Sequence, residues 1–150
     1  MDDLTSRAQQ DRPAAGLAGA PPDLLGRIRA AVRRPSGTDD RLRTIVRILS
    51  EGVAKYTWTG VYLLQGDRLV LHNQVGPATP HETIPIGEGI CGLAARQGKT
   101  VLVPDVGRNP SYLACSHTTR SEIVVPILKE GRVIGEIDVD SDRLDAFDDG

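Results

Sequence analysis

Aromatic residues and cysteines are both scarce in this chain of 150 residues. Only 3% of the residues are aromatic, and only two are cysteines. Two cysteines are too few for a disulfide scaffold, and in a reducing compartment such a pair is more often reactive or simply buried. The length suits a single domain with a real hydrophobic core. Each aromatic side chain is therefore noticeable, and each cysteine needs its own interpretation.

Long apolar runs and an excess of charge of one sign are missing as well. The formal net charge is −2, which favours neither nucleic acid nor a membrane surface as a partner. The chain begins without the charged and apolar regions of a signal peptide, and no stretch is apolar enough to span a bilayer. We therefore expect a soluble, cytoplasmic protein.

The first part of the chain is weakly patterned. Residues 1–22 are rich in Ala, Gly, Pro and charge, which predicts disorder. Residues 23–37 are expected to form a short amphipathic helix, with Asp23 as its N-cap, and a linker. A stronger helical pattern runs from residue 38 to about Lys55. We expect one domain over residues 38–150.

The remaining sequence reads mainly as strands. The patterns predict a hairpin over 58–74, a short extended piece over 83–86 and a helix of small residues over 90–97. A further strand over 100–103, a long irregular stretch over 105–120 and a second hairpin over 121–141 follow. Strands that follow each other directly, with helices before and between them, indicate an α+β fold with an antiparallel sheet. An irregular stretch as long as 105–120 is usually functional or disordered.

The second hairpin carries an unusual set of carboxylates. Glu136, Asp138 and Asp140 alternate onto one face of its return strand, and Glu122 lies at the start of the partner strand. Carboxylates on a mostly buried strand are costly. The set is either a solvated strand end or part of a pocket, and the apolar neighbours Ile137 and Val139 favour the pocket.

Two aromatic residues and the two cysteines are further candidates. Trp58 and Tyr62 share one face of a strand and could line one wall of a pocket. Cys91, within GICGLAA, reads as a small buried residue. Cys115 lies in a polar loop beside His117, which would favour its thiolate, so a reactive role and an ordinary one stay open. The histidines are too scattered to indicate a metal site.

These motifs together resemble the GAF-domain free methionine-(R)-sulfoxide reductases. The resemblance covers residues 40–149, and it is carried by GEGICGLAA, PDV, YLAC, SEIVVPI and VIGEIDVDS in this order and spacing. The cysteine of YLAC, the glutamate seven residues later and IDVDS are its specific parts. The resemblance implies a GAF domain with a central antiparallel sheet, helices packed mainly on one face, and a homodimer.

The resemblance also implies roles for particular residues. It matches Cys115 to the catalytic cysteine and Cys91 to a resolving cysteine. It matches Glu122, Asp138 and Asp140 to substrate-binding carboxylates, and Trp58 and Tyr62 to aromatic residues of the pocket wall. The implied activity is the reduction of free L-methionine-(R)-S-oxide to L-methionine through a cysteine sulfenic acid and a disulfide, with thioredoxin or a similar dithiol as reductant. The family reaction needs no metal and no organic cofactor.

Two departures from the family pattern accompany the resemblance. Many members carry a further cysteine where this chain has His81, which puts the route of recycling in question. Members also continue into a terminal helix, whereas this sequence stops at Gly150, so either the helix starting near Asp23 covers that surface or the sequence is a shortened copy. The alternative functions are a non-catalytic GAF module that binds a small molecule, and a redox sensor without turnover.

Overall fold

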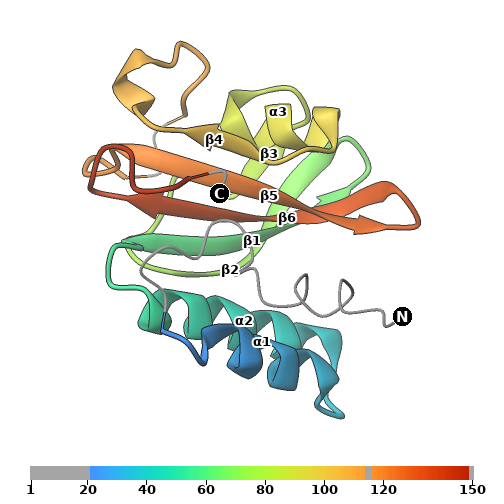
Figure 1. Ribbon diagram of the computed structural model, residues 1–150. Helices are drawn as coiled ribbons and strands as arrows, with labels where there is room; N and C mark the ends of the chain where they lie inside the picture. Colours follow the sequence, from blue (N-terminus) through green and yellow to red (C-terminus); the bar gives the residue numbers. More distant parts are fainter. Residues whose placement is uncertain (1–20, 114–115, 149–150) are drawn as a thin grey trace, which may run out of the picture.

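A six-stranded sheet forms the centre of the molecule and has helices on both faces (Figure 1). The computed structural model describes residues 21–113 and 116–148. Its elements in chain order are α1 Leu24–Arg33, α2 Thr38–Gly52, β1 Trp58–Gln65, β2 Arg68–Val75, β3 Thr83–Pro85, α3 Gly89–Gln97, β4 Val101–Val103, the 3₁₀ turn Val106–Arg108, β5 Ser121–Lys129 and β6 Arg132–Ser141. Helices α1 and α2 lie on one side of the sheet and α3 on the other (Figure 1).

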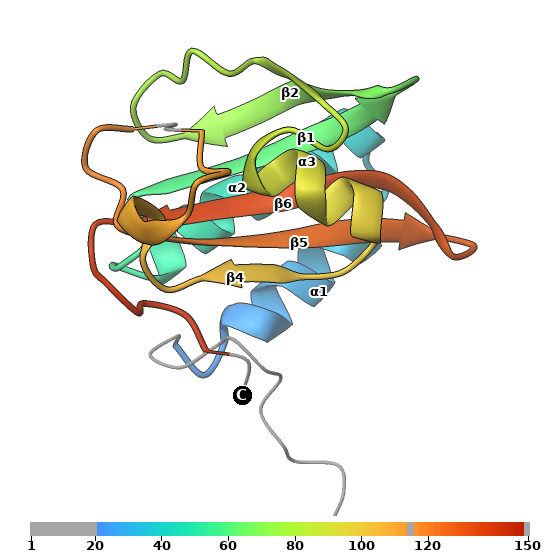
Figure 2. The same cartoon turned by 90° about the horizontal axis from the view of Figure 1, so that it is seen from above.

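The strands are ordered β3-β2-β1-β6-β5-β4, and every neighbouring pair is antiparallel. Two hairpins, β1–β2 and β5–β6, are joined through the pairing of β1 with β6, which brings the first and last strands together at the centre (Figure 2). The expected α+β class, with an antiparallel sheet and most of its helices on one face, is confirmed.

The β5–β6 hairpin closes on a tight two-residue turn. Lys129 pairs with Arg132, and Glu130 and Gly131 between them have φ angles of 52° and 75°. Two successive positive φ values match the twist of the flanking strands. Glycine adopts a positive φ readily, whereas Glu130 is one of the few residues with a side chain that does so among the described residues.

The two N-terminal helices differ from expectation at their ends. Asp23 makes no capping hydrogen bond with its side chain, because its own backbone is already close to helical, with φ −91° and ψ −7°. Helix α2 stops at Gly52 rather than near Lys55, since Val53 turns to an extended conformation and buries its side chain. Helix α1 packs on α2 through a cluster that includes Leu24 and Ile48. The expected domain start at residue 38 and the disorder of residues 1–22 stay predictions, and residues 1–20 lie outside the described part of the chain.

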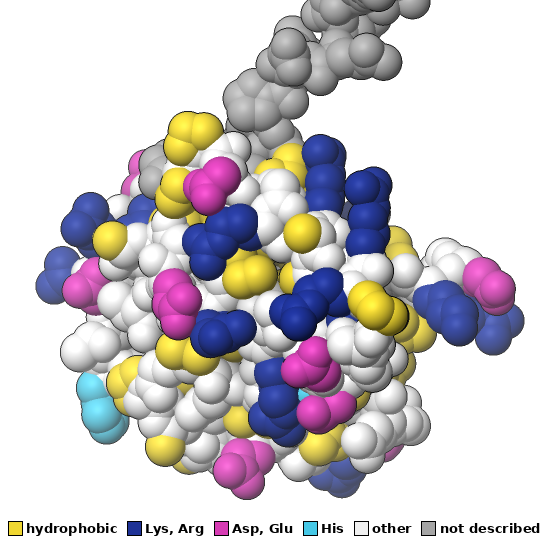
Figure 3. Space-filling model, turned by 90° about the horizontal axis from the view of Figure 1, so that it is seen from below, with side chains coloured by type: hydrophobic (Ala, Val, Ile, Leu, Met, Phe, Trp, Pro, Cys, Tyr) yellow, Lys and Arg dark blue, Asp and Glu magenta, His cyan; other side chains and the backbone are white. Residues whose placement is uncertain are grey.

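Hydrophobic residues fill both sides of the sheet unevenly. The larger cluster lies between the sheet and α3 and includes Trp58, Tyr62 and Ile90. A smaller one, with Val139 and Phe147, lies on the opposite side. Seen from that opposite side, the surface carries many Lys and Arg side chains (Figure 3). Among residues 21–113 and 116–148, no helix is long and apolar enough to cross a membrane.

Candidate active site

The register of the central strands gathers four carboxyl groups on the side of the sheet that faces α3. Glu136, Asp138 and Asp140 of β6 pair with Tyr62, Gly60 and Trp58 of β1, and Glu122 of β5 pairs with Asp140 from the other side. Because alternate residues of a strand share a face, these side chains converge above one patch of sheet. All four carboxyl residues are at most 2% exposed. The hypothesis of a solvated strand end is therefore wrong.

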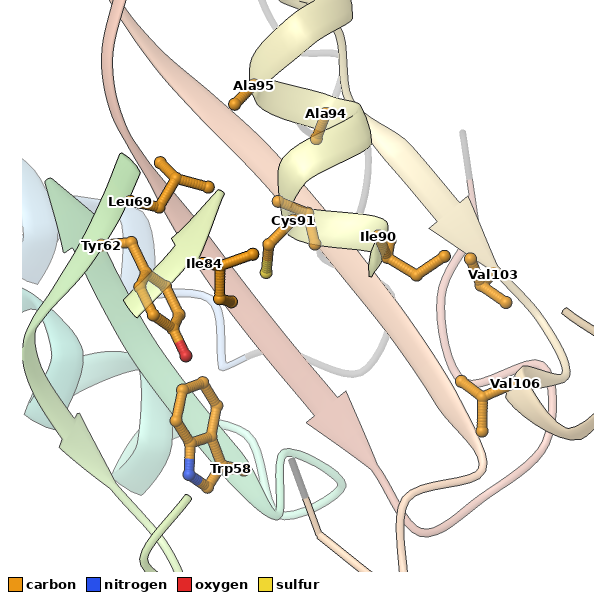
Figure 4. Packing of buried hydrophobic residues seen from close by; sticks show 11 residues of the cluster. Trp58, Tyr62, Leu69, Ile84, Ile90, Cys91, Ala94, Ala95, Val103 and Val106 are labelled. Atoms are coloured by element: carbon orange, nitrogen blue, oxygen red, sulfur yellow. The ribbon is translucent and has the colours of Figure 1, made fainter. Parts of the chain in front are cut away.

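Aromatic side chains form the β1 wall of this patch (Figure 4). The indole of Trp58 lies over Gly60, where a Cβ would come within 2.3 Å of its ring, so only glycine fits there. Trp58 Nε1 donates a hydrogen bond to the carbonyl of Pro77 at 3.0 Å, and the Tyr62 hydroxyl donates to the carbonyl of His81 at 2.8 Å. The two rings, 6.4 Å apart between centroids, are thus fixed by both packing and hydrogen bonds.

Helix α3 supplies the thiol of the site. Gly92 allows helix α3 to pack closely against the backbone of Pro85, since a Cβ at Gly92 would lie 2.6 Å from the carbonyl oxygen of Pro85. Cys91, the preceding residue, is 3% exposed and points from α3 toward the sheet (Figure 4). Its Sγ donates to Asp138 Oδ2 at 3.2 Å and lies 4.0 Å from Glu122 Oε1. The predicted burial of Cys91 is confirmed, but its surroundings are carboxyl groups as well as apolar side chains.

Burial changes the protonation of all four carboxyl groups. Loss of hydration raises the pKa of Glu136 to about 8 and that of Asp140 to about 9, and the neighbouring Asp138 raises both further. The pKa of Glu122 is raised well above its usual range, first by burial and then by the nearby charges of Asp138 and Asp140. The pKa of Asp138 is raised least, to about 6, because contacts with Glu122 and Cys91 offset part of the effect of its burial.

Asp138 is therefore the carboxyl group of this row that ionises most readily, and burial favours the protonated form of the other three. Within the described part of the chain, one oxygen each of Glu122, Asp138 and Asp140 and both oxygens of Glu136 are buried without a hydrogen-bond partner. Thr119 donates to the other oxygen of Asp140 at 3.2 Å. Buried polar groups are normally paired, so a polar ligand that reached these oxygens would be stabilised there. The site can hold a cation, donate protons, or do both.

Most of the residues predicted from sequence meet here, with one addition and one that cannot be placed. Cys91, Trp58, Tyr62 and the three predicted carboxylates share the patch, whereas Cys115 lies outside the described residues. Glu136, fully buried in the same row, was not included in the predicted site. Its alternation with Asp138 was visible in the sequence, but the resemblance gave it no role.

Cys91 and Glu122 also line a small cavity with Ile84 and Leu113, about 10 Å³ in volume, enough for roughly one water molecule. One oxygen each of Glu122 and Asp138, together with the sulfur of Cys91, forms a set of possible metal ligands within 4.8 Å of one another. The polar atoms of the site are thus concentrated around a space of atomic size.

Comparison with known proteins agrees with this architecture. The family model described as "GAF domain" matches residues 37–150. A "GAF domain-containing protein A" of Dictyostelium discoideum is 39% identical over 127 residues, which are 84% of this chain and 79% of the relative. A "Free methionine-R-sulfoxide reductase" of Saccharomyces cerevisiae is 39% identical over 95 residues, 61% of this chain, and the match spans about half of the yeast protein, 52%.

A solved structure gives the same result in three dimensions. The X-ray structure of a free methionine-R-sulfoxide reductase from Neisseria meningitidis, in complex with its substrate, is 38% identical to this chain with a TM-score of 0.77. The similarity covers 83% of this chain and 74% of that one. The predicted resemblance is therefore confirmed: the chain belongs to the GAF domain family and is related to the free methionine-(R)-sulfoxide reductases within it.

Proposed function

We propose that this chain reduces free methionine-(R)-sulfoxide to methionine. The observation that carries the proposal is the buried row of carboxyl groups beside Cys91, found in a chain with the fold of enzymes named for this reaction. A protein that needed only to fold would gain nothing from four buried carboxyl groups with unpartnered oxygens. A substrate with a positive charge and a polarised oxygen satisfies them.

Substrate binding assigns different tasks to the carboxyl groups. Asp138, the group with the lowest pKa in the row, pairs with the ammonium of the free amino acid. Trp58 and Tyr62, held by their hydrogen bonds, form the wall against which the side chain packs. A methionine sulfoxide inside a polypeptide lacks the ammonium, so this pairing selects the free amino acid.

The chemical step uses the protonated carboxyl groups. A sulfoxide becomes a good electrophile when its oxygen receives a proton, and Glu122 or Asp140, whose pKa values are raised, supplies that proton. The thiolate of Cys115 attacks the sulfur of the protonated sulfoxide, an S–S bond forms, and the S–O bond breaks as the oxygen takes a second proton and leaves as water. A water molecule then attacks the Cys115 sulfur and releases a proton, the S–S bond breaks, and methionine leaves while a sulfenic acid remains on Cys115. The net result is the transfer of one oxygen equivalent from the sulfoxide to the cysteine.

Recycling uses the second cysteine. The thiol of Cys91 condenses with the sulfenic acid to give a disulfide and one molecule of water, and Asp138, 3.2 Å from its sulfur, can accept the thiol proton. His81 cannot form a disulfide, so Cys91 is the remaining thiol in the chain for this step. Thioredoxin or a similar dithiol then restores both thiols. A homodimer and a cytoplasmic location in the defence against oxidative stress complete the proposal.

Cysteine variants test the proposal. Cys115→Ser should abolish methionine formation while leaving the circular dichroism spectrum unchanged. Cys91→Ser should still reduce one equivalent of sulfoxide but recycle poorly with thioredoxin, and a small external thiol should partly rescue it. Mass spectrometry of the oxidised protein should find a Cys91–Cys115 disulfide. Normal turnover of Cys115→Ser would overturn the proposed mechanism.

The same experiment separates an enzyme from a redox sensor. Cys91 and Cys115 could also switch between thiol and disulfide without turnover, and the buried thiol at Asp138 is compatible with that role. An enzyme releases many methionines per chain with a recycling reductant, whereas a sensor reacts at most once. A module that only binds a small molecule releases none.

A further inference from the structure

We propose that Cys91, Glu122 and Asp138 form a binding site for one zinc-like divalent cation, which blocks the pocket reversibly. The ligand atoms come from helix α3 and from the neighbouring strands β5 and β6, so one ion would connect the helix to the sheet. Binding of the ion does not depend on the reductase activity, although its three ligands are also residues of the proposed active site. Its consequence, competition between metal and substrate, rests on the proposed function.

The separations of the donor atoms suit a small tetrahedral ion. Zinc bonds of about 2.3 Å to sulfur and 2.1 Å to oxygen, at the tetrahedral angle, place the two ligand atoms roughly 3.6 Å apart. The observed separations from Cys91 Sγ are 3.2 Å to Asp138 Oδ2 and 4.0 Å to Glu122 Oε1, one on each side of that value. All three donor atoms lie within 4.8 Å of one another.

The burial of these side chains and a small cavity beside them also favour the binding of an ion. Glu122 and Asp138 are each at least 98% shielded from solvent, and each has an oxygen without a hydrogen-bond partner in the described part of the chain. Cys91 and Glu122 line the cavity of about 10 Å³, which is the space of one water or one ion rather than of a larger molecule. The unpartnered atoms are the second oxygens of the same two carboxyl groups, Glu122 Oε2 and Asp138 Oδ1, and the cavity beside Cys91 and Glu122 is a separate observation.

The donor types decide which cation fits. A thiolate with two carboxylates suits a borderline-soft ion such as Zn²⁺ or Cd²⁺, whereas Mg²⁺ and Ca²⁺ prefer oxygen ligands alone. Three protein ligands leave one position of a tetrahedron for water or another small donor. Binding requires the thiol and the carboxyl groups to lose their protons, so the affinity should rise with pH. Glu136 and Asp140 lie on the same face of β6 as Asp138.

Cadmium binding to the full-length, reduced, metal-free protein tests the site. Thiolate-bound Cd²⁺ has an ultraviolet charge-transfer band, and titration at pH 8 should produce this band with one ion per chain. Zn²⁺ should displace the Cd²⁺, and Mg²⁺ should not. Cys91→Ser should abolish the band. Glu122→Gln and Asp138→Asn should each weaken Cd²⁺ binding at least about tenfold, because each removes a charged ligand.

Matched controls identify the thiol and the carboxyl groups. Cys115→Ser removes the other cysteine and should keep the band, and Glu136→Gln alters a buried carboxyl group outside the donor set and should keep the affinity within about threefold. Circular dichroism confirms that each variant is folded. A band that survives in folded Cys91→Ser, or that disappears in folded Cys115→Ser, would overturn the site. Displacement of Cd²⁺ by free methionine sulfoxide would show the shared pocket, and a Cys91-dependent band in a chain without reductase activity would refute the proposed function while supporting the metal site.

Discussion

Two acidic regions of this molecule use the same chemical group in opposite ways. On the surface, Asp39 of α2 contacts Arg43 at 3.0 Å and His72 at 2.9 Å, and these neighbours, Arg43 first, hold the pKa of its carboxyl group below the usual value. Beneath α3, burial raises the pKa of Asp140 to about 9. None of the ion pairs formed by described residues includes a carboxyl group of the buried row.

The difference lies in what surrounds each group. Asp39 has a cation beside it and is exposed to solvent, so its negative charge is stabilised without a ligand. Asp138 and its neighbours have neither, and the fold leaves several of their oxygens unpartnered. Burying a carboxyl group without partners costs folding free energy, and a bound ligand can offset that cost. Buried carboxyl groups with shifted pKa values therefore indicate a binding site, whereas exposed ion pairs do not.

The largest expected effect is on the pH dependence of stability. Glu136 has a folded pKa of about 8 against an ordinary value of 4.5, so its stabilising contribution is present in acid and is lost as the pH rises through about 8. At about 1.4 kcal/mol per unit of pKa difference, the loss is on the order of a few kcal/mol. The free energy of unfolding, measured with urea, should therefore fall from pH 5 to pH 9.

Glu136→Gln serves as the control for this decline. The amide cannot ionise, so the variant should lose less stability than the parent between pH 5 and pH 9. The effect of Asp39 on stability changes with pH in the opposite direction. Its pKa is lowered in the folded chain, so its stabilising contribution is present above pH 3.8, its ordinary pKa, and is lost in acid. Equal slopes for the parent and Glu136→Gln would mean that Glu136 ionises as freely in the folded chain as in the unfolded one.

An intermediate effect is expected on catalysis. Glu122→Gln or Asp140→Asn should lower kcat/KM for free methionine-(R)-sulfoxide at least about tenfold, equivalent to roughly 1.4 kcal/mol, because each removes one of the two groups proposed to donate the proton. Steady-state kinetics with a recycling dithiol would measure this. Unchanged kinetics in both amide variants and in Asp138→Asn would separate the buried row from the reaction.

The smallest effect is expected at the surface. Asp39→Asn removes the contacts with Arg43 and His72 but touches nothing in the pocket, so kcat/KM should stay within about twofold of the parent and the thermal midpoint should change little. Moderate salt should erase any difference in midpoint between the two proteins, since exposed ion pairs are screened. A loss of activity as large as that of Asp140→Asn would break the distinction between the two regions.

Much of this architecture follows from patterns that the sequence shows directly. Alternation along VIGEIDVDS predicted that Asp138 and Asp140 share a face, and the positions of Trp58 and Tyr62 predicted an aromatic wall, because the period of a strand fixes both. The ends of the helices were predicted less well: α2 ends at Gly52, and Val53 is extended and buried, so the helix does not continue to Lys55.

The contacts around Cys91 could not be predicted from spacing. Cys91 and Asp138 are 47 positions apart, and only the packing of α3 over the β5–β6 hairpin brings the thiol to the carboxylate. Glu136 shows the converse case, in which alternation placed the residue correctly while the family pattern gave it no role. Its buried, unpartnered oxygens, which only the structure reveals, make it part of the site.

Methionine release from free methionine-(R)-sulfoxide, with thioredoxin and its reductase for recycling, tests the central claim most directly. We predict many methionines per chain from the parent protein, none from Cys115→Ser, and no activity on a peptide that contains the same sulfoxide, because the peptide lacks the ammonium that we propose Asp138 binds. At most one methionine per chain under recycling conditions, or equal rates with the free and peptide-bound sulfoxide, would contradict the account.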